Sequence, residues 1–454
     1  MITMKFGGTS MGSPDSLKNV TDIIRLNLNE KPIVVVSAVS GTTDILIEIA
    51  NLALKSTKGY QQKLSDLKTK HFQIVEKLFP ADSNYKLDCI EILNEKFEVL
   101  TSYLTGINLI KELSPHSFDF ISSYGERLST VILSAYLNEV EIKSTFLMAD
   151  QFLVTTDQAS NADPILAETK KKGKPMIEKI IKAGKVPVIT GFFGKSKKGH
   201  ITTLGRGGSD YSASIIGTIT NSSEIQIWTD VSGIYTTDPR ICNDAKPHSL
   251  VSFREASELA RFGAKVIHPR TILPAIESRI PIYIKNTFEP TNKGTEITFD
   301  ERKVPHTIKS IALKKDVTLI TIETPEMLMT YGFLAKVFNL FNEYNIPVDI
   351  VATSEISVSV SIESKDYDKL VRELQKLGAV SIEKNLCIVA IVGLGLRGNL
   401  KLNAKILDGL AKLKIEAKVI TQGSTQNNFS IIVKSMDAIN AIQKTHKILF
   451  SKND

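Results

Sequence analysis

The feature that most constrains the fold is a repeated alternation between short, continuously apolar segments and longer amphipathic ones. Predicted strands occur at residues 32–39, 186–192, 223–230 and 280–286, of which the first is the most continuously apolar, and amphipathic stretches rich in Leu, Ile, Lys and Glu separate them. Apolar runs without polar alternation are typical of strands buried on both faces, as in parallel sheets covered by helices. The sequence therefore predicts a large α/β domain.

A change of composition at residues 288–307 marks the end of this domain, because the stretch is polar and carries Pro and Gly. Beyond it, the pattern strand, helix, strand, strand, helix occurs twice with an offset of about seventy residues, which is typical of duplicated units. We expect a catalytic domain at 1–298, a linker strand and a first small α+β domain at 299–385, and a second at 386–454.

Composition excludes several classes of protein. The formal net charge is +7, but the lysines are scattered, so no nucleic-acid partner is expected. The three cysteines lie far apart, which argues against disulfides or a zinc site and favours a cytoplasmic location. The longest apolar runs are too short to span a bilayer, so no membrane partner is expected. Four histidines share no metal-site spacing, namely His71, His116, His200 and His268.

A lysine and two glycines stand where the first predicted strand gives way to a helix. In "KFGGTS", residues 5–10, the glycines would leave backbone amides free for an anion. The positive end of the following helix and the mobile charge of Lys5 would add to this attraction. A plain turn with Lys5 at the surface is the alternative.

A second glycine-rich stretch, "TTLGRGGSDYSASIIG", precedes a predicted helix. Its glycines allow close backbone approach, and Arg206 offers a bidentate donor for a carboxylate or phosphate. Asp210 could orient a nearby lysine. Ser209 or Asp210 could also be the N-cap of the helix, but capping does not account for Arg206. Both descriptions can hold at once.

Other polar segments follow predicted strands or begin predicted helices. Thr43 follows a strand, Glu126 begins a helix, and residues 228–240 form a polar loop after a strand. Ligands of α/β sheets bind outside the carboxyl ends of strands, where such loops converge. Each feature alone also has a structural explanation: the helix dipole suits Glu126, and a lone lysine such as Lys265 is usually solvated.

Five motifs in order resemble the aspartokinases of the amino-acid kinase family: "KFGGTS", "SYGERLS", "GRGGSDYSA", "TDVSGIYTTDPR" and "FGAKVIHPR". The resemblance extends over about residues 5–270, and the duplicated tail resembles paired ferredoxin-like ACT domains. It implies an amino-acid kinase fold with a mainly parallel sheet between helices. It also implies phosphoryl transfer from Mg·ATP to the side-chain carboxylate of L-aspartate, the first step of lysine, threonine, methionine and diaminopimelate biosynthesis.

The resemblance further implies roles for individual residues. Lys5 would neutralise the transferring phosphoryl group, and Asp210 would orient this lysine. Arg206 would hold the α-carboxylate of aspartate and Glu126 its ammonium. The other expected aspartate contacts are Thr43, Gly207, Gly208 and Ser209. The other expected ATP contacts are Gly7, Gly8, Ser10, Thr229, Asp230, Tyr235, Arg240, Lys265 and Val266. Phosphates and water would hold most of the Mg²⁺ coordination, so no protein ligand to a metal is expected.

The first tail domain resembles the lysine-binding segment of lysine-sensitive, monofunctional aspartokinases, although a threonine stands where that class typically has serine. A turn at Gly332 could receive a carboxylate, and Asp349 or Glu355 could receive ammonium groups. Ordinary helix and strand ends are the alternative. The expected lysine contacts are Met327, Thr330, Phe333, Leu334, Val348, Asp349, Ser354 and Glu355.

The expected protein is therefore a cytoplasmic aspartate kinase inhibited by L-lysine. Its ACT domains would build a homodimer, or a tetramer made of such dimers. Two alternatives stay open. An amino-acid kinase for glutamate or acetylglutamate is disfavoured by the Glu126 motif and the double ACT tail. A non-catalytic ACT-type amino-acid sensor is disfavoured by intact Lys5, Arg206 and Asp210.

Overall fold

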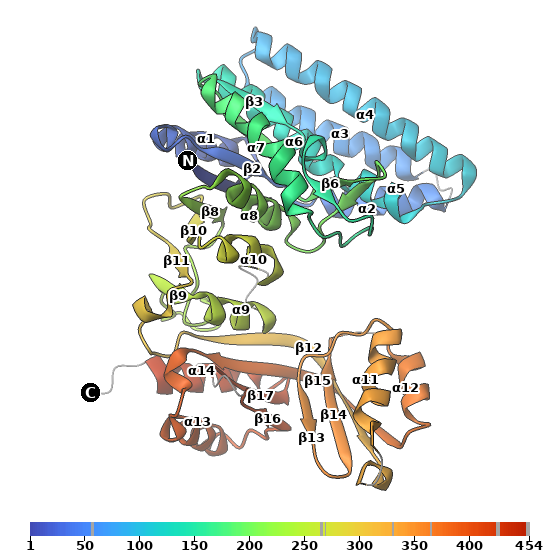
Figure 1. Cartoon of the computed structure of the whole chain (residues 1–454), viewed down its shortest axis with the longest axis vertical. Helices are drawn as coiled ribbons and strands as arrows, with labels where there is room; N and C mark the ends of the chain where they lie inside the picture. Colours follow the sequence, from blue (N-terminus) through green and yellow to red (C-terminus); the bar gives the residue numbers. More distant parts are fainter. Residues whose placement is uncertain are drawn as a thin grey trace. The chain divides into compact units, whose positions relative to one another are not determined.

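The computed structural model describes residues 1–55, 59–263, 267, 269–328, 331–363, 366–423 and 427–450. The chain forms two compact units (Figure 1). The first unit consists of Met1–Ile234, Ser249–Phe253 and Val266–Phe299. The second unit consists of Tyr235–His248, Arg254–Lys265 and Asp300–Asp454. The expected domain limits after residues 298 and 385 stay predictions, since the two units interleave along the sequence.

The first unit is built on an eight-stranded sheet with the order β3-β5-β2-β1-β8-β10-β11-β9. Its strands are β1 (Ile2–Phe6), β2 (Ile33–Val36), β3 (Ser144–Leu147), β5 (Val186–Thr190), β8 (Glu224–Thr229), β9 (Leu250–Ser252), β10 (Ile282–Asn286) and β11 (Thr295–Thr298). All neighbours pair in parallel except β10 and β11, which are antiparallel. Every residue of β1, β2 and β5 is buried. The predicted parallel sheet of buried strands is confirmed.

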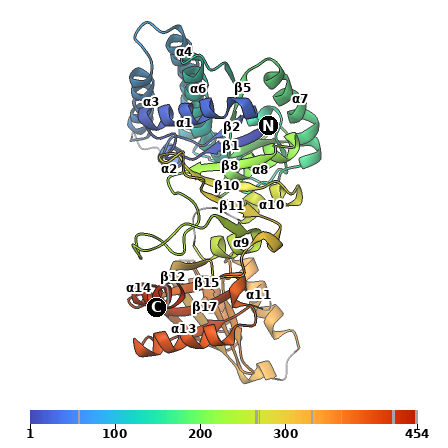
Figure 2. The same ribbon diagram turned by 90° about the vertical axis from the view of Figure 1, so that its left-hand side faces the viewer.

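Helices cover both faces of this sheet, as Figure 2 shows. One face carries α1 (Pro14–Leu26), α2 (Thr42–Leu54), α3 (Gly59–Leu78), α4 (Asn84–Ile110) and α6 (Tyr124–Glu139), which share one apolar core. The other face carries α7 (Leu166–Lys182), α8 (Gly208–Thr220) and α10 (Pro269–Glu277). The predicted start of α1 is confirmed, because Ser13 is its N-cap and Pro14 its first residue.

Strand alternation in β1 decides which of its residues meet which helix. The side chains of Met4 and Phe6 belong to the apolar core that includes residues of α1 and α6. Thr3 lies on the opposite face, where a Cβ on Gly217 of α8 would be in ordinary van der Waals contact with the Thr3 hydroxyl, at 3.5 Å. Because residues two apart share a face, Lys5 also faces α8.

A second, smaller sheet lies beside the main one. It has the order β4-β6-β7, with β4 (Val154–Thr155) parallel to β6 (Phe193–Ser196) and β6 antiparallel to β7 (Ile201–Thr203). The short helix α5 (Pro115–Ser122) packs against β7. The hairpin of β6 and β7 leads directly into the glycine-rich stretch before α8.

The second unit contains a six-stranded antiparallel sheet with the order β13-β14-β12-β15-β17-β16. Its strands are β12 (Ser310–Glu323), β13 (Val351–Thr353), β14 (Ser357–Ile362), β15 (Ala379–Val392), β16 (Val419–Thr421) and β17 (Asn428–Lys434). The second unit also contains the helices α9 (Phe253–Arg261), α11 (Phe333–Glu343), α12 (Asp368–Leu374), α13 (Leu400–Lys412) and α14 (Ala438–Phe450). The duplicated strand and helix pattern is confirmed.

The two α+β modules share one sheet, which was not predicted. The 14-residue strands β12 and β15 pair along most of their lengths, from Ser310 with Val392 to Glu323 with Ala379. The expected limit between residues 385 and 386 falls inside β15. In the described part of the chain, no helix is long and apolar enough to cross a membrane.

Truncating a core leucine of α6 should destabilise the first unit selectively. Leu133 is fully buried, so Leu133→Ala should lower the free energy of unfolding by about 2–5 kcal/mol. The matched control is Leu109→Ala in α4, where the side chain is 74% exposed and the change should stay within about 0.5 kcal/mol. Trp228, the only tryptophan, is buried in this unit, so its fluorescence during denaturant titration reports the transition. Equal effects of the two variants would contradict this packing.

Candidate active site

The central feature of the candidate site is an ion pair between β1 and α8. The Nζ atom of Lys5 lies 2.6 Å from Oδ1 of Asp210, and the two side chains are only 11% and 14% exposed. Lys5 is therefore not a surface lysine, which removes the alternative of a plain turn. Burying an ammonium is costly unless a carboxylate compensates it, so Asp210 holds Lys5 in this position.

The start of α8 differs from the prediction. Neither Ser209 nor Asp210 is the N-cap: the helix begins at Gly208, its N-cap is Gly207, and no side chain caps it in the described part of the chain. The prediction is wrong because both side chains have tertiary partners, Glu126 for Ser209 and Lys5 for Asp210. They are thus available to the site instead of the helix end.

Arg206 occupies a short glycine loop immediately before α8. It is exposed and stands between Gly205, at φ 78°, and Gly207, at φ 71°. These left-handed conformations favour glycine. The loop therefore presents a guanidinium next to the N-terminus of a 13-residue helix, where an anion is also attracted by unpaired backbone amides.

Glu126 lies in the first turn of α6 and is only 3% exposed. The helix start is pressed against the loop after β2, since a Cβ on Gly125 would lie 2.5 Å from the Cβ of Ala38. Burial raises the pKa of Glu126 to about 8, although hydrogen bonds from the Ala38 main chain and the Ser209 hydroxyl, and the charge of Lys5, oppose the rise. Its Oε2 atom has no hydrogen-bond partner among the described residues.

The loop after β1 is held by hydrogen bonds to the neighbouring segments. The Gly7 amide donates to the Trp228 carbonyl at 3.0 Å, so this amide is not free for an anion. The Ser10 hydroxyl lies 2.7 Å from the Thr287 hydroxyl, and the Thr287 amide donates to the carbonyl of Thr229. The carboxyl ends of β1, β8 and β10 therefore meet at one edge of the sheet.

Close packing also shapes Gly8. A Cβ there would lie 3.2 Å from the carbonyl oxygen of Ala38, so a side chain would press into the loop after β2. Thr43 is half-buried in the first turn of α2, next to Thr42, whose buried hydroxyl has no partner among the described residues.

The expected ATP contacts are divided between the two units. Thr229 and Asp230 lie at the end of β8 in the first unit, where the Thr229 hydroxyl donates to Asp230 at 3.0 Å. Tyr235 and Arg240 belong to the second unit, where the exposed Arg240 pairs with Asp238 at 2.7 Å. Lys265 and Val266 lie outside the described residues.

One residue of the site was not predicted from sequence. Gly191 follows β5, and a Cβ at this position would lie 2.7 Å from the Cβ of Ser209. A side chain there would push Ser209 away from Glu126. The available signal was a glycine directly after a buried strand, in the same position as Gly7 after β1.

The expected lysine segment lies in the second unit. Asp349 pairs with Lys314 of β12 at 2.7 Å, and its Oδ2 atom has no hydrogen-bond partner among the described residues. Gly332, at φ 78°, is the N-cap of α11 as expected. Phe333 is buried in the module core, and Met327 and Val348 pack against that core.

The remaining residues of that segment are more exposed. Leu334 is 39% exposed, Ser354 forms a turn with Ser357 at 2.7 Å, and Glu355 faces solvent. Thr330 lies outside the described residues. Lys314 was not predicted, because it comes from a strand far from the recognised segment.

Replacing Glu126 by Gln should change how stability depends on pH. Because burial raises the folded pKa from 4.5 to about 8, the folded protein keeps a proton that the unfolded chain has lost between these values. The contribution of Glu126 to the free energy of unfolding therefore falls as pH rises through this interval, by at most about 1.4 kcal/mol per pH unit.

The Glu126→Gln variant should consequently become more stable relative to wild type as pH rises from about 5 to about 8. Above pH 8 the difference should level off, since both states of wild type are then ionised. Denaturant titrations across this range, followed by Trp228 fluorescence, measure it. A difference that does not change with pH would contradict a raised pKa.

Comparison with known proteins identifies the family. Residues 1–286 match the Amino acid kinase family, and residues 320–377 and 389–449 match the ACT domain. The chain is 36% identical over 470 aligned residues to "Aspartokinase 1, chloroplastic" of Arabidopsis thaliana. This alignment covers 99% of this chain and 80% of that protein.

Two crystal structures of E. coli aspartokinase III are also similar to this chain. The complex with aspartate and ADP (R-state) has a TM-score of 0.87 at 31% identity, and the complex with lysine and aspartate (T-state) has 0.83 at 32%. Each match covers 99% of this chain and 100% of the other. The chain therefore belongs to the aspartokinases, within the amino acid kinase family.

Proposed function

We propose that this chain catalyses the reaction ATP + L-aspartate = 4-phospho-L-aspartate + ADP at the edge of the sheet where Lys5, Asp210, Glu126 and Ser209 meet. The observation that carries the proposal is the buried Lys5–Asp210 ion pair beside the buried Glu126. The similar E. coli enzyme binds aspartate and ADP. The reaction is the first step of lysine, threonine, methionine and diaminopimelate biosynthesis.

The residues present suit transfer to a carboxylate. The side-chain carboxylate of aspartate is ionised at neutral pH, so the nucleophile needs no general base. Catalysis then consists of aligning two anions and neutralising charge on the transferring phosphoryl group. The ammonium of Lys5 supplies this charge, and Asp210 positions it.

Recognition of aspartate follows from two groups of opposite charge. Arg206 forms a bidentate pair with the α-carboxylate, and Glu126 receives the α-ammonium. Since Glu126 has a pKa of about 8 in the free protein, the substrate ammonium supplies the cation that its ionised form lacks. The other aspartate contacts are Thr43, Gly207, Gly208 and Ser209.

The nucleotide binds at the ends of β1 and β8. Gly7 and Gly8 allow the phosphates to approach the backbone, although the Gly7 amide itself stays with Trp228. The other ATP contacts are Ser10, Thr229, Asp230, Tyr235, Arg240, Lys265 and Val266.

Mg²⁺ accompanies the nucleotide and screens the charge of its phosphates. The nearby carboxylates have other partners, since Asp210 pairs with Lys5 and Glu126 receives the Ser209 hydroxyl. This arrangement suits an ion held mainly by phosphate oxygens and water.

Regulation by L-lysine takes place in the first ACT module. Two copies of the chain pair through their ACT domains as a homodimer, or as a tetramer of such dimers. Asp349 is the main support, because its side chain is only 11% exposed and its Oδ2 atom has no hydrogen-bond partner among the described residues, which suits an incoming ammonium. The similar E. coli enzyme has been captured with lysine and aspartate. The other lysine contacts are Met327, Thr330, Phe333, Leu334, Val348, Ser354 and Glu355.

Removing either member of the ion pair should abolish most of the activity. Lys5→Met removes the charge that the transition state requires, which should lower kcat by about 100-fold or more. Asp210→Asn leaves the lysine but removes its anchor, and misplacement of a catalytic group by about 1 Å can cost about 100-fold. An ADP-release assay dependent on aspartate and magnesium measures both.

The matched control is Lys18→Met, which removes a half-exposed lysine from α1 of the same unit and should leave kcat unchanged. Trp228 fluorescence verifies that each variant is folded. Full turnover by a folded Lys5→Met protein would refute its role. Turnover of glutamate or acetylglutamate in place of aspartate would refute the proposed substrate, and nucleotide binding without any turnover would favour the amino-acid sensor.

Replacing Lys314 should make the enzyme more sensitive to lysine. The Lys314 ammonium already lies against Asp349, so an effector ammonium must displace it or bind beside a like charge. Lys314→Met should therefore lower the lysine concentration for half-inhibition several-fold, by about ten-fold if one pK unit of repulsion is relieved. Asp349→Asn should raise it. Lys336→Met, at an exposed position of α11, is the control. Unchanged inhibition in Lys314→Met would contradict an effector site at Asp349.

A further inference from the structure

Two histidines and an aspartate that have no part in the kinase reaction meet beside the small sheet of the first unit. The side chains of His116, Asp157 and His200 each offer one ligand atom, and these three atoms lie within 4.8 Å of one another. His116 is in the first turn of α5, Asp157 follows β4, and His200 directly precedes β7. Their distance along the sequence explains why spacing did not reveal the cluster.

The polar atoms of the cluster are suited to a cation. The Nδ1 atom of His116 is buried and has no hydrogen-bond partner among the described residues. Its ring stacks on His200 with centroids 4.2 Å apart. Imidazole nitrogens are among the commonest protein ligands of transition-metal ions.

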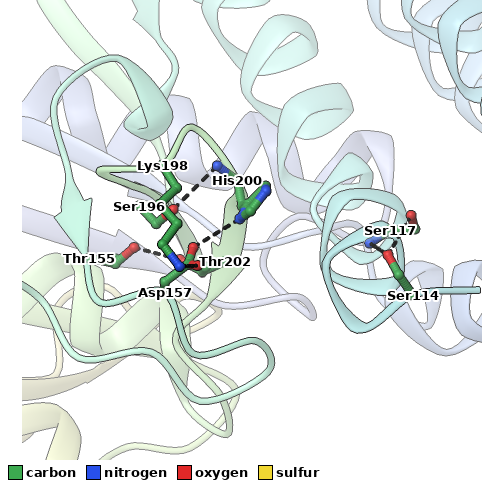
Figure 3. A network of polar contacts seen from close by, with 8 residues as sticks. All are labelled: Ser114, Ser117, Thr155, Asp157, Ser196, Lys198, His200 and Thr202. Carbon is green, nitrogen blue, oxygen red and sulfur yellow. Dashed lines mark hydrogen bonds and ion pairs between the residues drawn. The ribbon is translucent and has the colours of Figure 1, made fainter.

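Asp157 supplies the negative charge. Its Oδ1 atom lies 2.9 Å from Nδ1 of His200 (Figure 3). Aspartate side chains are ordinarily ionised at neutral pH, so this carboxylate brings a negative charge to the two histidines. Lys198 also pairs with Oδ2 at 3.1 Å, but its side chain is 73% exposed, and such surface pairs are weak.

The backbone segments that carry the three residues are fixed. Thr155 of β4 is hydrogen-bonded to Thr202 of β7 at 2.6 Å, and Ser114 caps the first turn of α5 through Ser117 (Figure 3). The buried Asp119 of α5 accepts the Thr203 amide and hydroxyl at 2.8 and 3.0 Å. Because His116 lies one turn before Asp119, this contact also fixes His116 relative to β7.

We propose that His116, Asp157 and His200 form a binding site for a divalent transition-metal ion of the zinc class. Two imidazoles and one carboxylate are a ligand set that zinc accepts, with water in the fourth position. Ligand atoms of a tetrahedral zinc site are about 3.4 Å apart, so small side-chain rotations suffice from the observed geometry. The ion would join α5 to the hairpin of β6 and β7, which leads to the loop of Arg206.

The test is metal binding by the full chain, without nucleotide and after treatment with a chelator. Every protein in this test carries Cys242→Ser, because Cys242, Asp244 and His446 form a second cluster that could bind the probe metal. Co²⁺ is followed by its visible absorption and Zn²⁺ by calorimetry. One equivalent should bind, excess Mg²⁺ should not compete because it prefers oxygen ligands, and Zn²⁺ should raise the temperature of unfolding.

Four variants locate the site. His116→Ala and His200→Ala should each weaken binding by more than about ten-fold, because loss of a residue that merely supports a ligand already costs about 10- to 100-fold. Asp157→Asn should also weaken it. Lys198→Met should tighten it, since a competing cation is removed from the carboxylate. His306→Ala, at an exposed position elsewhere, is the control.

Two results would overturn the proposal. One is absence of Zn²⁺ and Co²⁺ binding in the Cys242→Ser protein. The other is binding that survives unchanged in both His116→Ala and His200→Ala, with Trp228 fluorescence showing that these variants are folded. Since every readout is binding or stability, the outcome does not depend on kinase activity.

Discussion

The alternation of side chains along β1 is the constraint on which the candidate site depends. Met4 and Phe6 enter the apolar core, so Thr3 and Lys5 must face α8 on the other side of the sheet. A lysine at the centre of a parallel sheet cannot stay without a counter-charge. Asp210 provides this counter-charge at 2.6 Å, so the ion pair joins β1 to α8 at the candidate site.

Two carboxylates near this pair, Asp210 and Glu126, have different surroundings. The Asp210 carboxylate lies against the ammonium of Lys5 at 2.6 Å. Glu126 lies in a buried position where its pKa rises to about 8, although Lys5 and Ser209 are near. The proposed function uses this difference, because Asp210 would position a cation of the protein and Glu126 would receive a cation from the substrate.

Much of the fold could be predicted from the sequence because its signals are local. The apolar runs of the parallel strands, the cap of α1 at Ser13 and the duplicated pattern of the second unit each lie within a short stretch of sequence. The predicted cap of α8 is wrong because Ser209 and Asp210 bind side chains that are distant in sequence. Propensity for a helix cap is weaker than these tertiary contacts. The shared sheet of the second unit was missed for a similar reason, since β12 pairs with β15 through residues 56 to 82 positions apart in the sequence, from Glu323 with Ala379 to Ser310 with Val392.

The sequence by itself determined the alternation of strands and helices, the glycine loops and the order of the motifs typical of aspartokinases, because each is written in neighbouring residues. Only the tertiary structure decided that Lys5 is buried against Asp210, that burial raises the pKa of Glu126 to about 8, and that Lys314 contacts Asp349. It also decided that His116 and His200 stack. The burial of a site residue and the charges around it depend on segments from the whole unit. No local sequence pattern can therefore predict them.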